Sequence, residues 1–348
     1  MNARRKMNKL RYGLIGYGLF GQHHARMIQE ADGIELTAIS ANSDASRSSA
    51  ARDHPDAAII ADYRELVARD DVDIVDIVVP NRLHFETAQA ALENGKHVLL
   101  EKPMALNFPD CDALIQLAAA RQLTLAIGHE LRLSSLWGRV RQLIDEGAIG
   151  SPQYTLIELS RFPYRQGSQG WRYDKQRVGS WVLEEPIHFF DLARWYMQPI
   201  GEPIRVTARG NSRDSDRPDL YDNFTAIIDY PGDQYAVVSQ TLAAFGHHQT
   251  AKVVGTEGTI WAHWSAADAR SDKSSYGLTY GIGDQVTEEK IAQPAGELLE
   301  LAAEIVAVAE AVRSGNPPPC TGADGRWSTQ LCLAAEESIR SGRPVSFP

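Results

Sequence analysis

The chain has 348 residues, a mass of 38.4 kDa and a formal net charge of −10, with 43% hydrophobic and 23% charged residues. This length favours two domains, and the composition is typical of a folded globular protein rather than a disordered one. The acidic balance argues against nucleic acid or an anionic membrane surface as the main partner. No apolar run in the sequence approaches the roughly 18 residues that a membrane-spanning helix needs.

The three cysteines, Cys111, Cys320 and Cys332, stand far apart and form no CxxC pair. We expect buried thiols in a reducing compartment, because this spacing supports neither a disulfide framework nor a zinc site. Residues 1–8 are expected to form a loose tail, since no apolar, cleavable signal segment follows the basic residues at the start. Together these features favour a cytoplasmic protein.

Residues 1–128 alternate short apolar runs with segments of helical periodicity. Continuous apolar runs such as 74–79 are typical of strands buried on both faces of a parallel sheet. The alternation predicts a doubly wound α/β domain that binds its ligand beyond the carboxyl ends of the strands. The expected strands are 10–15, 34–40, 58–60, 74–79, 97–100 and 123–127, and the expected helices are 22–30, 46–53, 63–68, 85–93 and 109–120.

Residues 129–348 have longer strands at wider spacing, which predict a second domain of the α+β type with an open, mostly antiparallel sheet. A tight turn is expected at 255–258, and Gly315 and Gly342 follow the last two helices as C-caps would. The expected strands are 153–160, 204–209, 223–229, 236–242 and 250–254, and the expected helices are 135–146, 297–314 and 324–341.

A GxGxxG pattern follows the first expected strand directly and precedes a helix. Its first glycine permits a tight turn, the second lets the backbone approach a pyrophosphate, and the third lets helix and strand pack closely. Free N–H groups at the start of the helix would bind the phosphates. The alternative is an ordinary structural turn. The pattern predicts a dinucleotide site made by Gly16, Tyr17, Gly18, Leu19, Phe20 and Gly21.

The end of the second strand is where NAD and NADP are normally distinguished. An acidic residue there would bind the ribose 2′-hydroxyl of NAD. This chain has Ala41 at the expected place, and Asp44 comes late. Asn42 can bond either ribose, and Arg47 is close by. The pattern leaves NAD and NADP open and leans toward NAD.

Two further polar segments follow strands on the expected ligand side. One contains Pro80, Asn81 and His84; the other is Glu101-Lys102-Pro103. Lys102 could be a simple surface charge. The apolar strand before it and the restricted backbone of Pro103 after it favour a role in proton transfer.

A third candidate segment lies between Gly179 and Asp191. Glu184 and His188 are four residues apart, and His188 and Asp191 are three apart, spacings that share one face of a helix. Pro186 fits a first helical turn, so the Glu184 end is expected to be non-helical. A histidine flanked by a carboxylate can act as a general base; the alternative is a core histidine with a satisfied hydrogen bond. No convincing third ligand accompanies these residues, so no metal is expected.

The order of these motifs resembles the Gfo/Idh/MocA oxidoreductases, the family of glucose–fructose oxidoreductase and inositol dehydrogenase. The resemblance covers nearly the whole chain, and its Glu-Lys-Pro motif is fairly specific. It implies an N-terminal Rossmann domain and a C-terminal domain, residues 129–348, that binds the substrate and whose open sheet commonly forms a homodimer or homotetramer interface. The motifs are GxGxxG, residues 80–84, Glu101-Lys102-Pro103, Trp171-Arg172 and the glycine-led segment ending His188 to Asp191.

The resemblance implies hydride transfer between NAD or NADP and a ring carbon of a sugar or cyclitol. Lys102 would contact the nicotinamide ribose and the substrate, its bond to Pro103 can be cis, and His188 would be the acid/base with Glu184 beside it. On the cofactor side the resemblance adds Asn81, His84, Glu101, Lys102, Trp171 and Arg172, and with Asn42 and Pro80 these complete the expected cofactor-binding residues. The residues expected around the substrate are Lys102, Glu130, Arg161, Tyr164, Glu184 and His188.

Several positions depart from the family pattern. Glu184 replaces the usual aspartate, Pro186 replaces a glycine, and Ser180-Trp181 replace a glycine pair. The segment 128–132 also differs from the common small-polar pattern. One extra methylene moves a carboxylate by more than about an ångström, which matters for a positioned base. These changes affect the expected substrate more than the reaction class.

Three functions fit the sequence. The first is a dehydrogenase in which His188, assisted by Lys102, removes the hydroxyl proton. The second is a glycosidase or sugar–sugar oxidoreductase that keeps a tightly bound dinucleotide. The third is a non-catalytic sensor of sugar or dinucleotide, against which the presence of both Lys102 and His188 argues.

Overall fold

The computed structural model describes residues 9–271 and 273–347. Residues 1–8, expected to form a tail, lie outside the described residues. The chain divides into two units, the first comprising residues up to Gly128 together with 301–323, and the second comprising 129–300 and 324–348. This differs from the expectation of one continuous second domain over 129–348. Residues 301–323 belong to the first unit because their apolar side chains complete its core.

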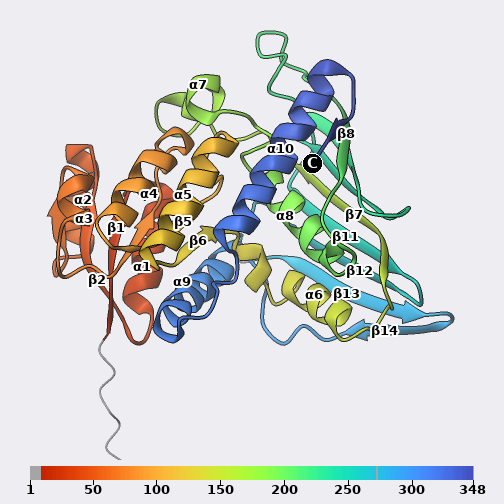
Figure 1. Cartoon of the computed structure of the whole chain (residues 1–348), viewed down its shortest axis with the longest axis horizontal. Coiled ribbons are helices and arrows are strands. Elements are labelled where there is room, and N and C mark those ends of the chain that lie inside the picture. Colours follow the sequence, from red (N-terminus) through yellow and green to blue (C-terminus); the bar gives the residue numbers. More distant parts are fainter. Residues whose placement is uncertain (1–8, 272, 348) are drawn as a thin grey trace, which may run out of the picture. The chain divides into compact units, whose positions relative to one another are not determined.

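The first unit is built on a six-stranded parallel sheet in the order β3-β2-β1-β4-β5-β6 (Figure 1). This order reverses between β1 and β4, so the chain winds in both directions from the middle of the sheet and confirms the doubly wound prediction. The strands are β1 (Leu10–Ile15), β2 (Ile34–Ser40), β3 (Ala58–Ile60), β4 (Ile74–Ile77), β5 (His97–Glu101) and β6 (Leu125–Gly128).

Helices cover both faces of this sheet. On one face, apolar side chains of α1, α2 and α9 pack on the sheet, and on the other face those of α3, α4 and α5 do so. Burial on both faces explains why these strands are continuous apolar runs. The helices are α1 (Leu19–Glu30), α2 (Asp44–Asp53), α3 (Tyr63–Val67), the short η1 (Asn81–Leu83), α4 (His84–Glu93), α5 (Phe108–Arg121) and α9 (Glu297–Ser314), the last from Leu301 onward.

The second unit contains a nine-stranded sheet in the order β14-β13-β12-β11-β7-β10-β9-β8-β15. Only β7 and β10 pair in parallel among the described strands of this sheet, so the mostly antiparallel prediction is confirmed. The strands are β7 (Pro152–Arg161), β8 (Arg205–Asn211), β9 (Asn223–Asp229), β10 (Tyr235–Thr241), β11 (His247–Gly255), β12 (Thr259–Ala266), β13 (Ser275–Ile282), β14 (Gln285–Glu289) and β15 (Val345–Ser346).

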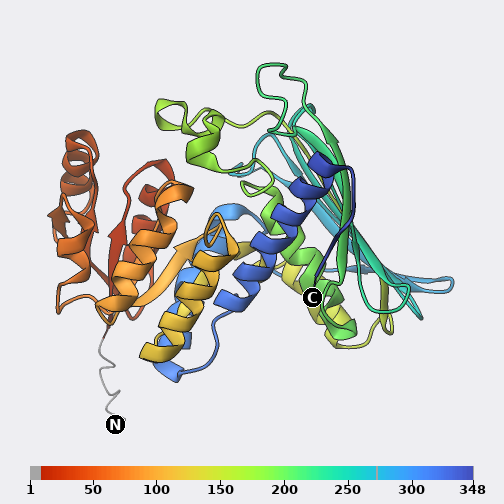
Figure 2. The same ribbon diagram turned by 45° about the horizontal axis from the view of Figure 1, so that its top comes forward.

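Helices lie along one face of this sheet, and Figure 1 and Figure 2 both show α6, α8 and α10 on the same side of the strands. Side chains along β9, β10 and β11 alternate between buried and more exposed, because only that side is covered. The helices are η2 (Glu130–Leu133), α6 (Trp137–Asp145), η3 (Ser168–Tyr173), α7 (Lys175–Val178), α8 (Pro186–Met197), η4 (Gln198–Ile200) and α10 (Gly322–Ser341), the last from Asp324 onward.

The expected elements of both units are present, with boundaries that shift by a few residues. The sequence missed β12 to β15, because β13 and β14 contain glycine and many polar residues and leave most of their side chains partly or fully exposed. The three cysteines are buried, as predicted. Across the described ranges, the helices are too short or too polar to span a bilayer.

Candidate dinucleotide and proton-transfer sites

The glycine turn between β1 and α1 has the shape of a phosphate cradle. Gly16 has φ +104°, and a Cβ there would lie 2.0 Å from the Val78 carbonyl oxygen. A Cβ on Gly21 would lie 2.1 Å from the oxygen of Gly16, whereas a Cβ on Gly18 would meet no atom within 4 Å. The outer glycines are therefore required by close packing, and the middle one leaves open space where a pyrophosphate would approach. The residues present fit a bound dinucleotide.

The large side chains of this turn divide between interior and surface. Tyr17 is buried and its hydroxyl donates to Asp53 of α2 at 3.1 Å. The ring of Phe20 lies edge-on to that of His24, at 4.8 Å. Leu19 is 73% exposed. Tyr17 therefore fixes the turn from inside, and the partly buried Phe20 packs against His24 of α1.

Asn42 is exposed just after β2, where the adenosine ribose of a Rossmann ligand lies. The guanidinium of Arg47 donates to the carbonyl oxygens of Ala41 and Asn42 at 2.9 and 2.7 Å, and it also pairs with Asp44. Arg47 thus closes the loop that carries Asn42. This arrangement remains compatible with either dinucleotide.

A buried triad, His24, Asp76 and Glu101, lies within the first unit. His24 Nδ1 lies 2.8 Å from Asp76 Oδ2, and its Nε2 lies 3.4 Å from Glu101 Oε1. Burial alone would lower the pKa of His24, but the two carboxylates raise it to about 10. Burial also raises the pKa of Asp76, against the pull of His24. Because the pKa of His24 is raised far above neutral pH, its imidazole retains a proton there and carries a positive charge.

The third member of the triad leads directly to Lys102. Burial would raise the pKa of Glu101, but the hydrogen bond and charge of His24 and the charge of Lys102 lower it below its usual range. Glu101 Oε2 accepts the backbone N–H of Lys102 at 3.2 Å. The ionised triad therefore fixes the backbone at the start of the Lys102–Pro103 segment.

His84 holds the other side of this segment. Its Nδ1 lies 2.6 Å from the carbonyl oxygen of Pro103, and its Nε2 lies 2.9 Å from that of Val79. Burial lowers the pKa of His84, although the two carbonyls favour its protonated form. The Lys102–Pro103 peptide bond is cis. Asn81, after Pro80, is buried as well, whereas Lys102 is only partly buried. His84, which follows β4, and Glu101, at the end of β5, thus both bond to the Lys102–Pro103 segment.

In the second unit, His188 is the third residue of α8, and Pro186 begins the first turn of this helix as predicted. A carboxylate of η2 faces the imidazole ring: His188 Nδ1 and Glu130 Oε2 are 3.6 Å apart. The ring of His129 lies edge-on to His188 at 5.3 Å. All three side chains are buried. Glu130, expected near the substrate, therefore lies beside the expected acid/base.

Asp191, the second carboxylate spaced for His188, bonds elsewhere. Arg132 donates to both of its oxygens, from Nε at 2.7 Å and from Nη2 at 2.8 Å, and Ser328 donates at 2.9 Å. Burial would raise the pKa of Asp191, but the charges of Arg132 and His129 lower it. Arg132 and Asp191 form a bidentate ion pair that joins η2 to α8.

Glu184 lies just before α8, outside the helix as predicted, and its Oε1 accepts from Arg172 Nε at 2.5 Å. Arg172 stacks over the ring of Trp171 at 4.7 Å, and Trp181 donates its indole N–H to the Arg172 carbonyl at 2.6 Å. Arg172 therefore bonds to Glu184, and Trp171 stacks on the guanidinium of Arg172. Whether they also reach the dinucleotide stays a prediction.

Arg161 and Tyr164, both expected near the substrate, lie together at the end of β7. The guanidinium of Arg161 stacks on the Tyr164 ring at 4.9 Å and pairs with Glu185. Burial lowers the pKa of Arg161. Glu185 also faces His247 Nε2 at 3.3 Å. The charge of Arg161 is therefore balanced within the protein by Glu185. The ring of Tyr164, which lies under this guanidinium, is buried.

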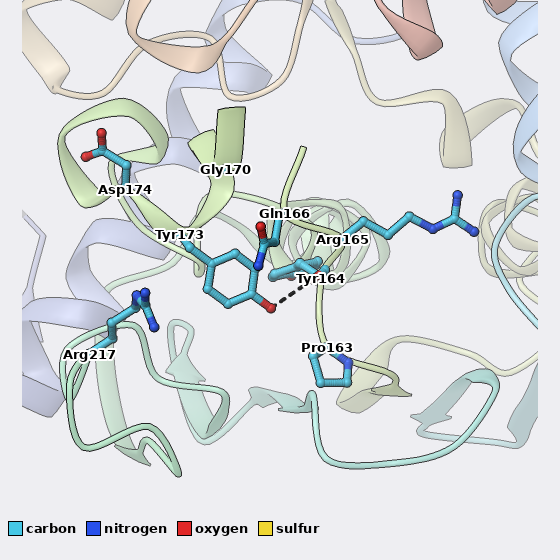
Figure 3. Close-up of a pocket in the computed structure, with 8 residues that line it drawn as sticks. All are labelled: Pro163, Tyr164, Arg165, Gln166, Gly170, Tyr173, Asp174 and Arg217. Atoms are coloured by element: carbon cyan, nitrogen blue, oxygen red, sulfur yellow. Dashed lines mark hydrogen bonds between the residues drawn. The ribbon is translucent and has the colours of Figure 1, made fainter. Parts of the chain in front are cut away.

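Beside Tyr164 the second unit has an open pocket of about 640 Å³ (Figure 3). The Tyr173 ring lies in its middle, between Arg217 and Arg165, and its hydroxyl donates to the Tyr164 carbonyl at 2.8 Å. The lining residues are Pro163, Tyr164, Arg165, Gln166, Gly170, Tyr173, Asp174 and Arg217. An aromatic ring among polar side chains is a surface that suits a polyhydroxylated ring.

Sequence reasoning missed the roles of His24, Asp76, Arg132 and Tyr173. Asp76 carried a usable signal, because a carboxylate inside the apolar run Ile74–Ile77 requires a buried partner. Its partner, His24, lies on α1, and nothing in the sequence around His24 indicates this contact. The same holds for Arg132, whose partner Asp191 is 59 residues away.

Comparisons with known proteins agree with both units. Residues 10–129 match the model of an oxidoreductase family with an NAD-binding Rossmann fold, and 137–261 match the GFO/IDH/MocA C-terminal domain. The chain is 28% identical to the uncharacterized oxidoreductase YrbE of Bacillus subtilis, over 96% of each chain. It is 27% identical to a myo-inositol 2-dehydrogenase of Thermotoga maritima, over 97% of this chain and 98% of that protein. A solved probable dehydrogenase of Thermotoga maritima superposes with a TM-score of 0.81 at 25% identity, covering 97% of this chain and 98% of the other.

Proposed function

Since the chain belongs to the Gfo/Idh/MocA family of NAD-binding oxidoreductases, we propose that it is a dehydrogenase that interconverts a ring alcohol and ketone of a sugar or cyclitol. The observation that carries the proposal is the fixed Lys102 segment. It follows β5 at the same sheet edge at which the Gly16 turn follows β1, with β4 between them. A bound NAD or NADP would accept or supply the hydride.

Gly16, Gly18 and Gly21 would hold the pyrophosphate, and Asn42 the adenosine ribose. Lys102 donates a hydrogen bond to the substrate oxygen, which stabilises negative charge on it as its proton leaves. His188 accepts that proton in the direction of oxidation and returns it in the direction of reduction.

The substrate class is proposed from the aromatic and polar surfaces of the second unit. Tyr173 offers a ring face, and Gln166, Asp174 and Arg217 offer donors and acceptors around it (Figure 3). Hydroxyl groups on a sugar or cyclitol need such bonds in place of the water that they lose. Glu184, bonded to Arg172, adds a further acceptor at the N-terminal end of α8.

We also propose that the uncovered face of the second sheet pairs with another copy of the chain. A row of mostly apolar side chains crosses this face in register: Ile227 opposite Val237, then Leu156, Lys252 and Trp261. Lys252 stacks on the Trp261 ring at 4.6 Å, and Trp261 is 59% exposed. A contiguous apolar row on a face that none of the described helices of this unit covers is typical of an interface between subunits.

The test is a spectrophotometric screen for reduced nicotinamide with sugars, inositols and their ketones as substrates. Lys102→Ala and His188→Ala are each expected to lower kcat by about 10²-fold or more, because each removes a group that handles the proton. Dinucleotide binding, followed by fluorescence titration, should persist in His188→Ala. Wild-type turnover by either variant on an active substrate would contradict the mechanism.

A further inference from the structure

We propose that Glu130, rather than Glu184, is the carboxylate that positions and charges His188, so that the histidine presents its Nε2 to the substrate. This inference rests on the proposed function for the role of His188. Its structural core is the 3.6 Å separation between Glu130 Oε2 and His188 Nδ1 in a buried setting. That separation is longer than a hydrogen bond and lies within ion-pair distance.

The two elements that carry these residues are joined by an ion pair. Glu130 begins η2, and Arg132 lies two residues later in the same turn. His188 lies in α8, and Asp191 lies three residues later. The bidentate bond between Arg132 and Asp191 therefore ties η2 to α8 next to the Glu130–His188 contact. Ser328 of α10 donates a further bond to Asp191, which fixes the same junction.

The other carboxylates of this region already face arginines. Glu184 is bonded to Arg172, and Glu185 is paired with Arg161. Each of these ion pairs has little net charge to act on the imidazole at a distance, since the opposite charges largely cancel. Glu130 Oε2, in contrast, lies at ion-pair distance from His188 Nδ1, 3.6 Å away.

The chemical consequence concerns the tautomer of His188. A carboxylate at Nδ1 favours a proton on that nitrogen, which leaves Nε2 as the acceptor for the substrate proton. After the transfer, the same carboxylate stabilises the imidazolium. The titratable and charged groups around this ring are His129 and Arg132 with Glu130 on the η2 side, Asp191 on α8, Asp324 on α10, and the Glu184–Arg172 pair before α8.

The experiment compares Glu130→Gln with Glu184→Gln, which makes the same change of a carboxylate to an amide on the other candidate. Without its negative neighbour, the imidazolium becomes less stable and His188 becomes neutral at a lower pH. The acidic limb of the pH profile of kcat in the oxidising direction should therefore move down by about one pH unit in Glu130→Gln. Its kcat should fall by about 10- to 100-fold with a smaller change in KM. In Glu184→Gln, which leaves the charge of Arg172 unbalanced, the limb should move down by less than in Glu130→Gln.

A second measurement is independent of activity and cofactor. The Cε1–H resonance of His188, assigned by its loss in His188→Ala, is titrated by NMR in the full chain. Its midpoint should move to lower pH in Glu130→Gln, and Glu130→Asp should restore part of the shift because it keeps the charge. A midpoint that moves in Glu184→Gln and not in Glu130→Gln would overturn the proposal. If the NMR shift is found but His188→Ala keeps full turnover, the pairing stands and the proposed catalytic role fails.

Discussion

Asp76 shows what a single charged residue demands of its surroundings. It lies inside the buried strand β4, where an isolated carboxylate would be costly, and His24 lies 2.8 Å away. The same imidazole also faces Glu101, whose other oxygen accepts the N–H of Lys102. A charge balance inside the core thus fixes the backbone position of the residue proposed to contact the substrate. The triad is structural in origin, and its effect on function is indirect.

The triad predicts a pH dependence of stability. The pKa of His24 is raised to about 10 from an ordinary value near 6.5, so its contribution is fully present below about pH 6.5 and is lost as pH rises toward 10. His24→Gln removes that contribution. The difference in urea midpoint between wild type and His24→Gln should therefore be largest near pH 6 and shrink by pH 10. A difference that is constant over this range would show that His24 is not charged in the folded protein.

At the scale of elements, α8 and η2 illustrate how short segments build a site. Pro186 starts α8, so the preceding Glu184 stays outside the helix, where Arg172 binds it. Four residues later His188 lies on the helix, and η2 brings Glu130 to it. Helical spacing alone suggested Glu184 or Asp191 as the partner of His188. The ion pairs of the neighbouring elements decide which carboxylate faces the ring.

The first turn of α9 gives a second prediction at this scale. Burial raises the pKa of Glu300 to about 7, although the Ser134 hydroxyl and the Gly296 backbone donate bonds to it. An acid with a raised pKa in the folded state loses stability as pH rises from about 4.5 to 7. Glu300→Gln should therefore be more stable than wild type at pH 8, by about 2 kcal/mol, and gain little at pH 5.

The measurement is denaturant unfolding of both proteins across this pH range. Glu297→Gln is the matched control, because Glu297 lies in the same first turn. Its side chain is only partly buried, and its carboxylate is bonded to Arg270. Equal gains in the two variants at pH 8 would mean that the helix terminus, not burial of Glu300, accounts for the effect.

At the scale of the whole chain, the two faces of the nine-stranded sheet differ clearly. Helices α6, α8 and α10 lie on one face (Figure 1). The opposite face carries the in-register row that ends at Trp261. The alternation of side chains along β9 to β12 matches this division. A sheet of nine strands with one apolar face uncovered is expected to bury that face against a second copy.

This proposal predicts the mass in solution. Wild type should elute as a dimer or tetramer by size exclusion with light scattering, and Trp261→Glu should shift it to a smaller species, because an interface does not tolerate a buried unpaired charge. Leu299→Glu, an exposed apolar position on α9, is the control and should leave the mass unchanged. A wild-type chain that is monomeric at all concentrations would refute the interface.

Local sequence patterns predict the parallel sheet, the glycine turn, the Lys102 segment and the start of α8. Each of these features depends on neighbours within a few residues, through apolar runs, glycine geometry or the proline ring. Other features emerge only when the chain is folded. They are the division of α9 between the two units, the His24 triad, the contact of Glu130 with His188, and the ion pair of Arg132 with Asp191. These choices depend on which distant charges meet in a buried, weakly screening interior, where the strength of each contact depends on separations that sequence spacing does not encode.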